Sequence, residues 1–322
     1  MRSLPTIAGA GLLALATLFA TAPAVRAGDT AFVTNQSSDD LSIVDLDTMT
    51  VTKTLPIGGK PAGIAITPNG ARVYVTSPEG KMLTVIDAMA DMVIKQIKLS
   101  GGPLGVAVHP SGAPVYVADW FSHSLLVVDP DAGKVTRTIQ TGNSPSGVAV
   151  SSDGALIVTA DRDSNQLSFI DAKTLEVVGS VKVGERPFGV SFSADNRTVY
   201  AANVGSNSVS VVDVAARSVT STVPVELRPY DTVAAAGKVF VTNQYAGTVG
   251  VFDQASGKIL KSIEVGEYPE GIGVGSDERF VYVACWFDNL LIKIDTDSLT
   301  KVGEAEVGDG PRAFGTFIRH AR

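Results

Sequence analysis

Two landmarks recur at a fixed spacing through almost the whole chain and constrain its fold more than any other feature. The first is an Asp that closes an apolar segment such as SIVD or LVVD: Asp45, Asp87, Asp129, Asp171, Asp213, Asp253 and Asp295. The second is a Pro that opens the next apolar segment: Pro61, Pro103, Pro145, Pro187, Pro229, Pro269 and Pro311. Both series advance by 42 residues, except for one step of 40 that they share. Two independent landmarks with one period indicate seven copies of one structural unit.

One copy, residues 61–99, is predicted to form four short β-strands. Its first apolar run, GIAIT, ends at the turn-forming sequence Pro-Asn-Gly, and three β-branched or alternating runs without a helical period follow. A single sheet of this kind cannot bury both faces, so the copies must stack on one another. Four strands in about 42 residues are typical of a β-propeller blade. The sequence therefore predicts an all-β protein, a seven-bladed β-propeller of four-stranded antiparallel blades.

The two ends of the repeat array predict how the ring closes. The array begins with the second strand of a copy, AFVTN at 31–35, and ends with a first strand, PRAFGTFI at 311–318. We therefore expect the C-terminal strand to complete the first blade, which joins both ends non-covalently and removes an exposed sheet edge. The short step of 40 falls in VAAAGKVF at 233–240, where other copies have a longer turn.

The first 27 residues are predicted to be a secretory signal peptide. Arg2 precedes an apolar run of 14 residues that begins at Ile7. This run is shorter than the roughly 20 residues of a transmembrane helix, and small residues follow it. We expect cleavage after Ala27, with Ala24 as the second choice; the alternative is a buried N-terminal helix. The expected product is a single domain over residues 28–322, periplasmic or secreted, with no membrane span after signal cleavage.

Composition excludes several classes of function. The 322 residues include 26 Lys and Arg against 33 Asp and Glu, and the formal net charge of −7 becomes −9 when the signal peptide takes two Arg away. An acidic chain without basic clusters argues against binding to nucleic acid. A single Cys excludes an internal disulfide, a four-thiolate zinc site and a CxxCH haem attachment. We predict neither a cofactor nor a resident metal.

The second strands of the copies carry a family resemblance. They read FVTN, VYVTS, VYVAD, IVTAD, VYAAN, FVTN and VYVAC, and elements such as NSVSVVD accompany them. Over residues 30–318 this pattern resembles the YVTN β-propeller repeat family. The resemblance implies a seven-bladed propeller that is often exported. Similar proteins include surface-layer proteins, lactonases of the phosphogluconolactonase type, and exported propellers associated with PQQ-dependent alcohol catabolism. The chain resembles this last group most in size and signal peptide, but a shared fold does not establish an activity.

Residues that break the repeat are the candidate functional residues, because the fold alone does not require them. The loops before the prolines and the loops after the second strands open on one face of a propeller, here called the proline face, at the mouth of the central channel. Four cations lie there: Lys60, Arg186, Arg228 and Arg312. Arg side chains suit carboxylates and phosphates, so these cations predict a site for a small anionic ligand or a partner protein. The alternative is pairing with neighbouring acids such as Glu185, Glu226 or Asp309.

Polar and aromatic residues on the proline face complete this candidate binding site. Tyr230 and Glu270 directly follow their prolines, and Asp231 stands where five other copies have Gly. After the second strands lie Asp119, Trp120, His123, Asp161, Trp286 and Asp288. The two Trp residues of the chain occupy equivalent places and predict either a recognition surface or plugs between blades.

Three further features have a possible chemical meaning. His123 is the one His placed to act as an acid or base. The run Asp161-x-Asp163-x-Asn165 imitates the start of a calcium loop, but the Gly and Glu of such a loop are missing, which leaves a looser cation site open. Cys285 ends a strand and is expected to be a half-buried, inert thiol. The seven repeated Asp are expected to close Asx-type turns.

These patterns favour a non-enzymatic binding or scaffold protein that uses the proline face as an exported monomer. A role beside a quinone-dependent oxidation system is implied by the resemblance alone. One alternative is a lactonase-like hydrolase in which Asp119, Asp161, Asp231 or Glu270 acts with His123 and the Arg cluster; another is a surface-layer structural protein. An enzyme needs an acid or base within reach of a substrate, whereas a scaffold needs an exposed complementary patch.

Overall fold

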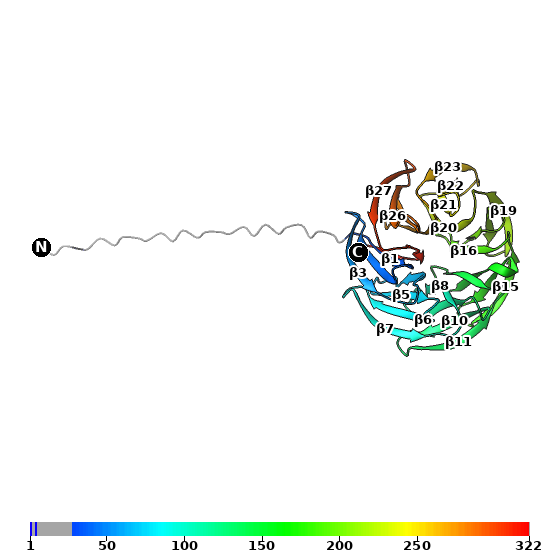
Figure 1. The fold of residues 1–322 in the computed structure, drawn as a ribbon, viewed down its shortest axis with the longest axis horizontal. Coiled ribbons are helices and arrows are strands. Elements are labelled where there is room, and N and C mark those ends of the chain that lie inside the picture. Colours follow the sequence, from blue (N-terminus) through cyan, green and yellow to red (C-terminus); the bar gives the residue numbers. More distant parts are fainter. Residues whose placement is uncertain (2–3, 5–27, 322) are drawn as a thin grey trace.

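Each copy of the repeat forms one blade, and in blades 2 to 7 the chain passes from the channel to the rim within the blade. The computed structural model describes Met1, Leu4 and residues 28–321, so the predicted signal peptide and its cleavage lie outside the described residues. Seven sheets surround a central channel, with β8, β16 and β20 near the centre and β7, β15 and β23 at the rim (Figure 1). The predicted seven-bladed propeller is confirmed. The described residues contain no helix long and apolar enough to cross a membrane.

The strands follow the repeat. Blade 1 contains β29 (Ile318–Arg319), β1 (Thr30–Asn35), β2 (Asp40–Asp45) and β3 (Thr50–Pro56). Blade 2 contains β4 (Gly63–Ile66), β5 (Arg72–Ser77), β6 (Met82–Asp87) and β7 (Met92–Lys98). Blade 3 contains β8 (Pro103–Val108), β9 (Val115–Asp119), β10 (Ser124–Asp129) and β11 (Lys134–Gln140). Blade 4 contains β12 (Pro145–Val150), β13 (Leu156–Asp161), β14 (Gln166–Asp171) and β15 (Glu176–Lys182), with the 3-10 turn η1 (Arg162–Ser164).

The remaining blades have the same order. Blade 5 contains β16 (Pro187–Phe192), β17 (Thr198–Asn203), β18 (Ser208–Asp213) and β19 (Ser218–Pro224). Blade 6 contains β20 (Pro229–Ala235), β21 (Lys238–Asn243), β22 (Thr248–Asp253) and β23 (Ile259–Glu264). Blade 7 contains β24 (Pro269–Val274), β25 (Phe280–Cys285), β26 (Leu290–Asp295) and β27 (Thr300–Glu306).

The repeated Asp closes the turn between the third and fourth strands of every blade. Asp45 Oδ1 accepts the backbone N–H groups of Asp47 and Thr48 at 3.0 and 2.8 Å. The other six Asp accept the N–H of the residue three positions later in the same way. The backbone hydrogen bond from Thr48 also holds the pKa of Asp45 below its usual value. The predicted Asx-type turns are confirmed, and these carboxylates serve the fold.

The innermost strands approach one another so closely that most copies require Gly after the Pro. A Cβ on Gly105 would lie 2.2 Å from the Ser146 carbonyl oxygen of the next blade. A Cβ on Gly147 would lie 2.5 Å from the Phe188 carbonyl oxygen. A residue other than Gly at this position, two after the Pro, therefore fits only where the neighbouring strand leaves room for its side chain.

The C-terminal segment closes the ring as predicted. β29 pairs antiparallel with β1, with Ala31 opposite Ile318, and an isolated bridge joins Asn35 and Pro311. The segment also reaches blade 2, because β28 (Phe314–Gly315) pairs in parallel with β4. This second pairing gives blade 2 a fifth strand, which the repeat pattern did not indicate.

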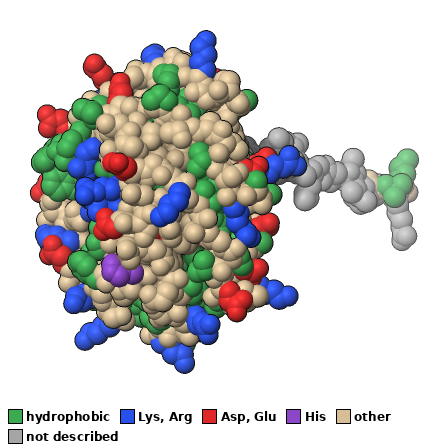
Figure 2. Space-filling model, turned by 90° about the vertical axis from the view of Figure 1, so that its right-hand side faces the viewer, with side chains coloured by type: hydrophobic (Ala, Val, Ile, Leu, Met, Phe, Trp, Pro, Cys, Tyr) green, Lys and Arg blue, Asp and Glu red, His purple; other side chains and the backbone are tan. Residues whose placement is uncertain are grey.

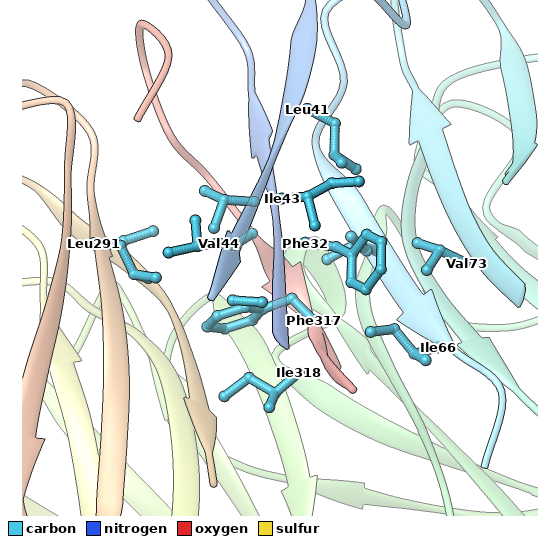
Figure 3. Packing of buried hydrophobic residues seen from close by; sticks show 14 of the residues in the cluster. Phe32, Leu41, Ile43, Val44, Ile66, Val73, Leu291, Phe317 and Ile318 are labelled. Atoms are coloured by element: carbon cyan, nitrogen blue, oxygen red, sulfur yellow. The ribbon is translucent and has the colours of Figure 1, made fainter. Parts of the chain in front are cut away.

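The closure is packed as well as hydrogen-bonded. Phe317 and Ile318 lie among side chains of blade 1, including Phe32 and Val44, with Ile66 and Leu291 from the two adjoining blades (Figure 3). Phe317 and Phe32 are fully buried. One hydrophobic cluster therefore joins the last strand to blades 1, 2 and 7.

Candidate functional site

The loops of the proline face share a backbone geometry that holds the residue before each Pro. Lys60, Arg186 and Arg228 have φ values of 59°, 53° and 56°, in the left-handed region. The backbone N–H of this residue donates to a side chain 21 residues upstream in five copies: Asp39 for Lys60, His123 for Ser144, Asn165 for Arg186, Asn207 for Arg228 and Asn289 for Gly310. The repeated polar residue at this offset was the sequence signal for the contact, and we had not predicted its role.

This arrangement gives His123 a structural role. Its Nδ1 accepts the N–H of Ser144 at 2.9 Å, the place that Asn165 and Asn207 take in the following blades. A ring nitrogen that accepts this hydrogen bond carries no proton, so the neutral ring donates only through Nε2. Loop geometry alone explains why a His occupies this position, so its presence is no argument for the acid or base predicted from the sequence.

Two of the four predicted cations are neutralised by acids of the protein. Lys60 Nζ lies 3.0 Å from Asp39 Oδ2, and Arg312 Nε lies 2.6 Å from Glu270 Oε2. Glu270 is 2% exposed and also accepts a hydrogen bond from Gln244 at 2.7 Å. Burial alone would lower the pKa of Arg312, but the Glu270 carboxylate outweighs this effect and raises it. These acids are not the ones that the sequence suggested as partners.

The other two cations, Arg186 and Arg228, have no ion-pair partner among the described residues. Arg186 is exposed, and the guanidinium of Arg228 lies 4.3 Å from the centre of the Tyr245 ring. The four cations therefore do not form one ring of free charge. The two that keep their charge available stand on the proline-face loops that open blades 5 and 6.

Aromatic rings fill the channel axis at the proline face. Phe188, Tyr230 and Phe314 lie with ring centres 4.5 to 5.4 Å apart; the first two come from the consecutive blades 5 and 6, and Phe314 comes from the closing segment. Trp120 packs on Phe188 at 6.4 Å, and the same cluster includes Ala62. Trp120 and Tyr230 thus belong to a plug of the channel mouth, whereas Trp286 lies outside this cluster and contacts Phe287.

A second aromatic group lies beside the plug on blades 6 and 7 and is called the aromatic patch. Its rings form a continuous series in which Tyr245 contacts Tyr268 at 5.1 Å, Tyr268 contacts Phe287 at 4.6 Å, and Phe287 contacts Trp286 at 4.6 Å. Tyr245 is 51% exposed and Phe287 52% exposed. With Leu227, 55% exposed, they give the proline face an apolar surface.

The three carboxylates after the second strands fasten loops. Asp119 accepts the N–H of Gly102 at 2.8 Å, Asp161 that of Gly142 at 3.0 Å, and Asp288 that of Glu267 at 2.6 Å. Each donor belongs to the loop before the Pro that opens the same blade. Burial raises the pKa of Asp161, against the hydrogen bonds it accepts from neighbouring hydroxyl groups.

The calcium-like run and the lone thiol also have structural explanations. Asp163 pairs with Arg162 at 2.6 Å, and Asn165 holds the Arg186 loop, so their oxygen atoms face protein donors. No group of three His, Cys, Asp or Glu in the described part of the chain is arranged to hold a metal. Cys285 is fully buried, where half-burial was expected, and burial raises the pKa of its thiol to about 12.

A cavity of about 500 Å³ occupies the opposite end of the channel, beside the turns between first and second strands. Its apolar wall comes from the innermost strands and the closing segment and includes Val106, Val148, Val190, Ile272, Phe317 and Ile318. Asp231 borders this cavity and also the neck of about 20 Å³ above it. The sequence placed Asp231 with the proline-face residues, whereas the structure places it below the plug, on the channel wall.

The outer surface has a mixed charge. Lys and Arg side chains alternate with Asp and Glu over the side of the ring shown in Figure 2, with small apolar patches between them. No extended basic surface lies on that side. This distribution agrees with the acidic composition and offers little attraction for a phosphate backbone there.

A family model described as a YNCE-like beta-propeller matches residues 14–112 and 105–204, more than half of the chain. The match supports the β-propeller family expected from the repeats, but it says nothing of the association with PQQ-dependent catabolism. None of the curated proteins is similar enough to count as a match.

Several solved structures share the fold. A functionally unknown protein from Desulfotomaculum acetoxidans DSM 771 is 21% identical, with a TM-score of 0.79 over 91% of this chain and 99% of that one. Kuenenia stuttgartiensis hydrazine synthase is 22% identical, with a TM-score of 0.71 over 79% and 89%. Dihydro-heme d1 dehydrogenase NirN in complex with DHE is 17% identical, with a TM-score of 0.68 over 86% and 63%. Identities this low show the fold alone.

Proposed function

The chain belongs to the YNCE-like β-propeller family, and from this premise we propose that it is an exported, non-enzymatic protein that binds a partner protein on its proline face. The observation that carries the proposal is the aromatic patch, with Tyr245 and Phe287 about half exposed beside Arg228. Aromatic and Arg side chains are enriched at the energetic centres of protein interfaces. Large rings in short turns between strands also lose little conformational entropy on binding.

The charge of the patch indicates the chemistry of the partner. Of the four predicted cations, Arg186 and Arg228 have no acidic partner in the described chain, and they stand on loops of consecutive blades. A partner surface with an apolar side chain flanked by carboxylates would complement them. The long-range potential of these two Arg would also raise the association rate, although the chain as a whole is acidic.

A binding role accounts for the polar residues better than hydrolysis does. Asp119, Asp161 and His123 hold loop backbones, and Glu270 is neutralised by Arg312. A lactonase would need one of these groups free to move a proton at the substrate. Export rests on the signal peptide predicted over residues 1–27. Association with a quinone-dependent oxidation system rests on the sequence resemblance to exported propellers of PQQ-dependent catabolism.

The test is capture of the partner from a periplasmic extract of the source organism on immobilised protein. Tyr245→Ser with Phe287→Ser removes the centre of the patch. Ile94→Ser with Ile259→Ser is the matched control, because these residues are 46% and 47% exposed on outermost strands. We expect the wild type and the control to retain the same protein and the patch variant to lose it. Equal retention by all three proteins, or none by any, would contradict the proposal.

The two Arg provide a second, graded arm of the same test. Arg186→Ala with Arg228→Ala is expected to weaken capture tenfold or more at low salt and to make what remains less sensitive to salt. Both side chains are at least partly exposed, so the melting temperature should fall by only about 2–3 °C. Undiminished capture by this variant would refute the carboxylate chemistry given to the partner.

A further inference from the structure

The cavity at the end of the channel opposite the proline face has the size and walls of a small-molecule site. Its volume of about 500 Å³ lies within the range of ligand pockets. Side chains such as Val148, Val190 and Ile318 make most of its surface apolar. Since the cavity and the aromatic patch lie at different ends of the ring, an occupant of one leaves the other accessible.

One buried carboxyl group interrupts this apolar wall, and the fold does not require it. Asp231 is 6% exposed and stands in the row that is Gly in five other copies. It fits because Gly189 has no side chain: a Cβ there would lie 2.4 Å from Asp231 Oδ1. Oδ1 accepts the N–H of Thr232 at 2.8 Å, and this is the one hydrogen bond that the Asp231 carboxyl makes within the described residues. The carboxyl borders both the cavity and its neck.

The charged groups around Asp231 leave it without a counter-ion. Arg312, on the proline-face side, is neutralised by Glu270. Arg319 and His320 line the rim of the cavity and hydrogen-bond to backbone carbonyl oxygens of neighbouring segments. None of these three side chains forms an ion pair with Asp231 in the described chain.

Tyr230, the chain neighbour of Asp231, is also buried. Burial raises the pKa of its hydroxyl, so this group carries no charge near neutral pH and cannot act as a counter-ion. An isolated carboxylate in an apolar cavity is costly unless a cation or a proton compensates it. A proton supplies this compensation below the pKa of Asp231, and a cation that enters the cavity can take the place of that proton.

We propose that this cavity binds a small organic amine with an apolar body, whose ammonium group pairs with Asp231. The valine-rich wall removes the body of the ligand from water, and the carboxylate supplies the one strong acceptor for its charged end. The pairing is specific, because a neutral molecule of the same shape gains only the apolar part of the interaction.

The proposal implies a definite pH dependence. Burial raises the pKa of Asp231 to about 8, so an ammonium ion must displace a proton from the carboxyl below that pH. Affinity for an amine should therefore rise with pH and level off above 8, increasing roughly 20-fold between pH 6.5 and 8.5. A neutral ligand that accepts a hydrogen bond from the protonated carboxyl would show the opposite trend.

The experiment is calorimetric titration of the full protein with 1-adamantylamine, 1-adamantanol and 1-adamantanecarboxylate at pH 6.5, 7.5 and 8.5. The three probes share one rigid apolar body and differ in charge. Asp231→Asn keeps the shape of the side chain, and Asp231→Gly restores the residue of five other copies. Asp297→Asn removes an exposed carboxylate elsewhere and serves as the matched control.

We expect the amine to bind the wild type and the Asp297→Asn protein with the same affinity, more tightly than the alcohol and the carboxylate. Both Asp231 variants should bind the amine at least tenfold more weakly and lose the pH dependence. Equal binding of amine and alcohol, unchanged amine affinity in Asp231→Asn and Asp231→Gly, or no amine binding at millimolar concentration would each overturn the proposal. Partner capture on the proline face is measured separately, so the two proposals fail independently.

Discussion

The two ends of the central channel are made by the same seven innermost strands, yet one end is filled and the other is open. At the proline face, Phe188, Tyr230 and Phe314 meet across the axis. At the other end, valine, alanine and glycine residues of the same strands leave about 500 Å³. The backbone of every blade is alike, so the difference arises from the size of the side chains at a few positions in different copies of the repeat. A propeller can therefore place a plug and a pocket on one axis without changing its fold.

Two buried carboxyl groups on consecutive blades repeat this contrast at the level of single residues. Glu270, one position after its Pro, lies by the plug and is paired with Arg312 and Gln244. Asp231, two positions after its Pro, faces the cavity and has no ion-pair partner in the described chain. The charge of buried Glu270 is compensated by Arg312, whereas buried Asp231 avoids a charge by keeping its proton near neutral pH.

The largest effect is expected from deletion of residues 311–321, the segment that reaches both ends of the channel. The deletion removes Phe314 from the plug, Phe317 and Ile318 from the cavity wall, and the inner strand of blade 1. Each buried apolar side chain contributes about 1.5–3 kcal/mol, so the total loss approaches the whole stability of a typical domain. Calorimetry should show no cooperative unfolding transition, whereas deletion of residues 320–321 alone should preserve one. A deletion of 311–321 that melts like the wild type would disprove the closure.

The comparison of the two carboxyl groups predicts opposite effects of the same substitution. Glu270→Gln leaves Arg312 as a buried cation without its counter-charge and should lower the free energy of unfolding by about 3–5 kcal/mol. Asp231→Asn removes an uncompensated acid and should raise it by about 4 kcal/mol at pH 7, because about three pH units separate that pH from the ordinary pKa of the carboxyl. Urea unfolding of both variants measures these changes. Destabilisation by both would mean that Asp231 is compensated within the protein after all.

The pH dependence sharpens this prediction. The pKa of Asp231 is about 8 in the folded state and near its ordinary value of 3.8 in the unfolded chain, so the folded state holds an extra proton between these limits. As the pH rises through that window, the free energy of unfolding of the wild type should therefore fall, relative to that of Asp231→Asn, by about 1.4 kcal/mol per pH unit. The two proteins should differ least below pH 4 and most above pH 8. A constant difference from pH 5 to pH 8 would be incompatible with the protonated carboxyl.

The sequence predicted the propeller closely because its signals are local and repeated. An Asp followed by its own turn, or a Gly two residues after a Pro, has the same meaning in every blade. The partners of Arg312 and Lys60 were not predictable in this way, since Glu270 and Asp39 lie 42 and 21 residues away. The cavity was missed for a related reason: its volume depends on how seven strands converge, which no single repeat specifies.

One local signal at the cavity end was available and leads to the smallest predicted effect. The innermost strand of blade 6 turns through Ala236 and Gly237, whose φ values of 50° and 71° fit the two-residue turn that makes this repeat short. Asn-Gly is the favoured pair for such a turn, and Ala is strained in the left-handed region. Ala236→Asn should stabilise the protein by about 0.5–1 kcal/mol, and Ala236→Val should destabilise it by more, because β-branched residues avoid positive φ. Both substitutions keep the N–H that donates to Glu278 at 2.8 Å, so the comparison isolates backbone conformation. Thermal unfolding measures the difference, and an Asn variant no more stable than the Val variant would show that this turn does not have the left-handed geometry that holds β20 beside the cavity.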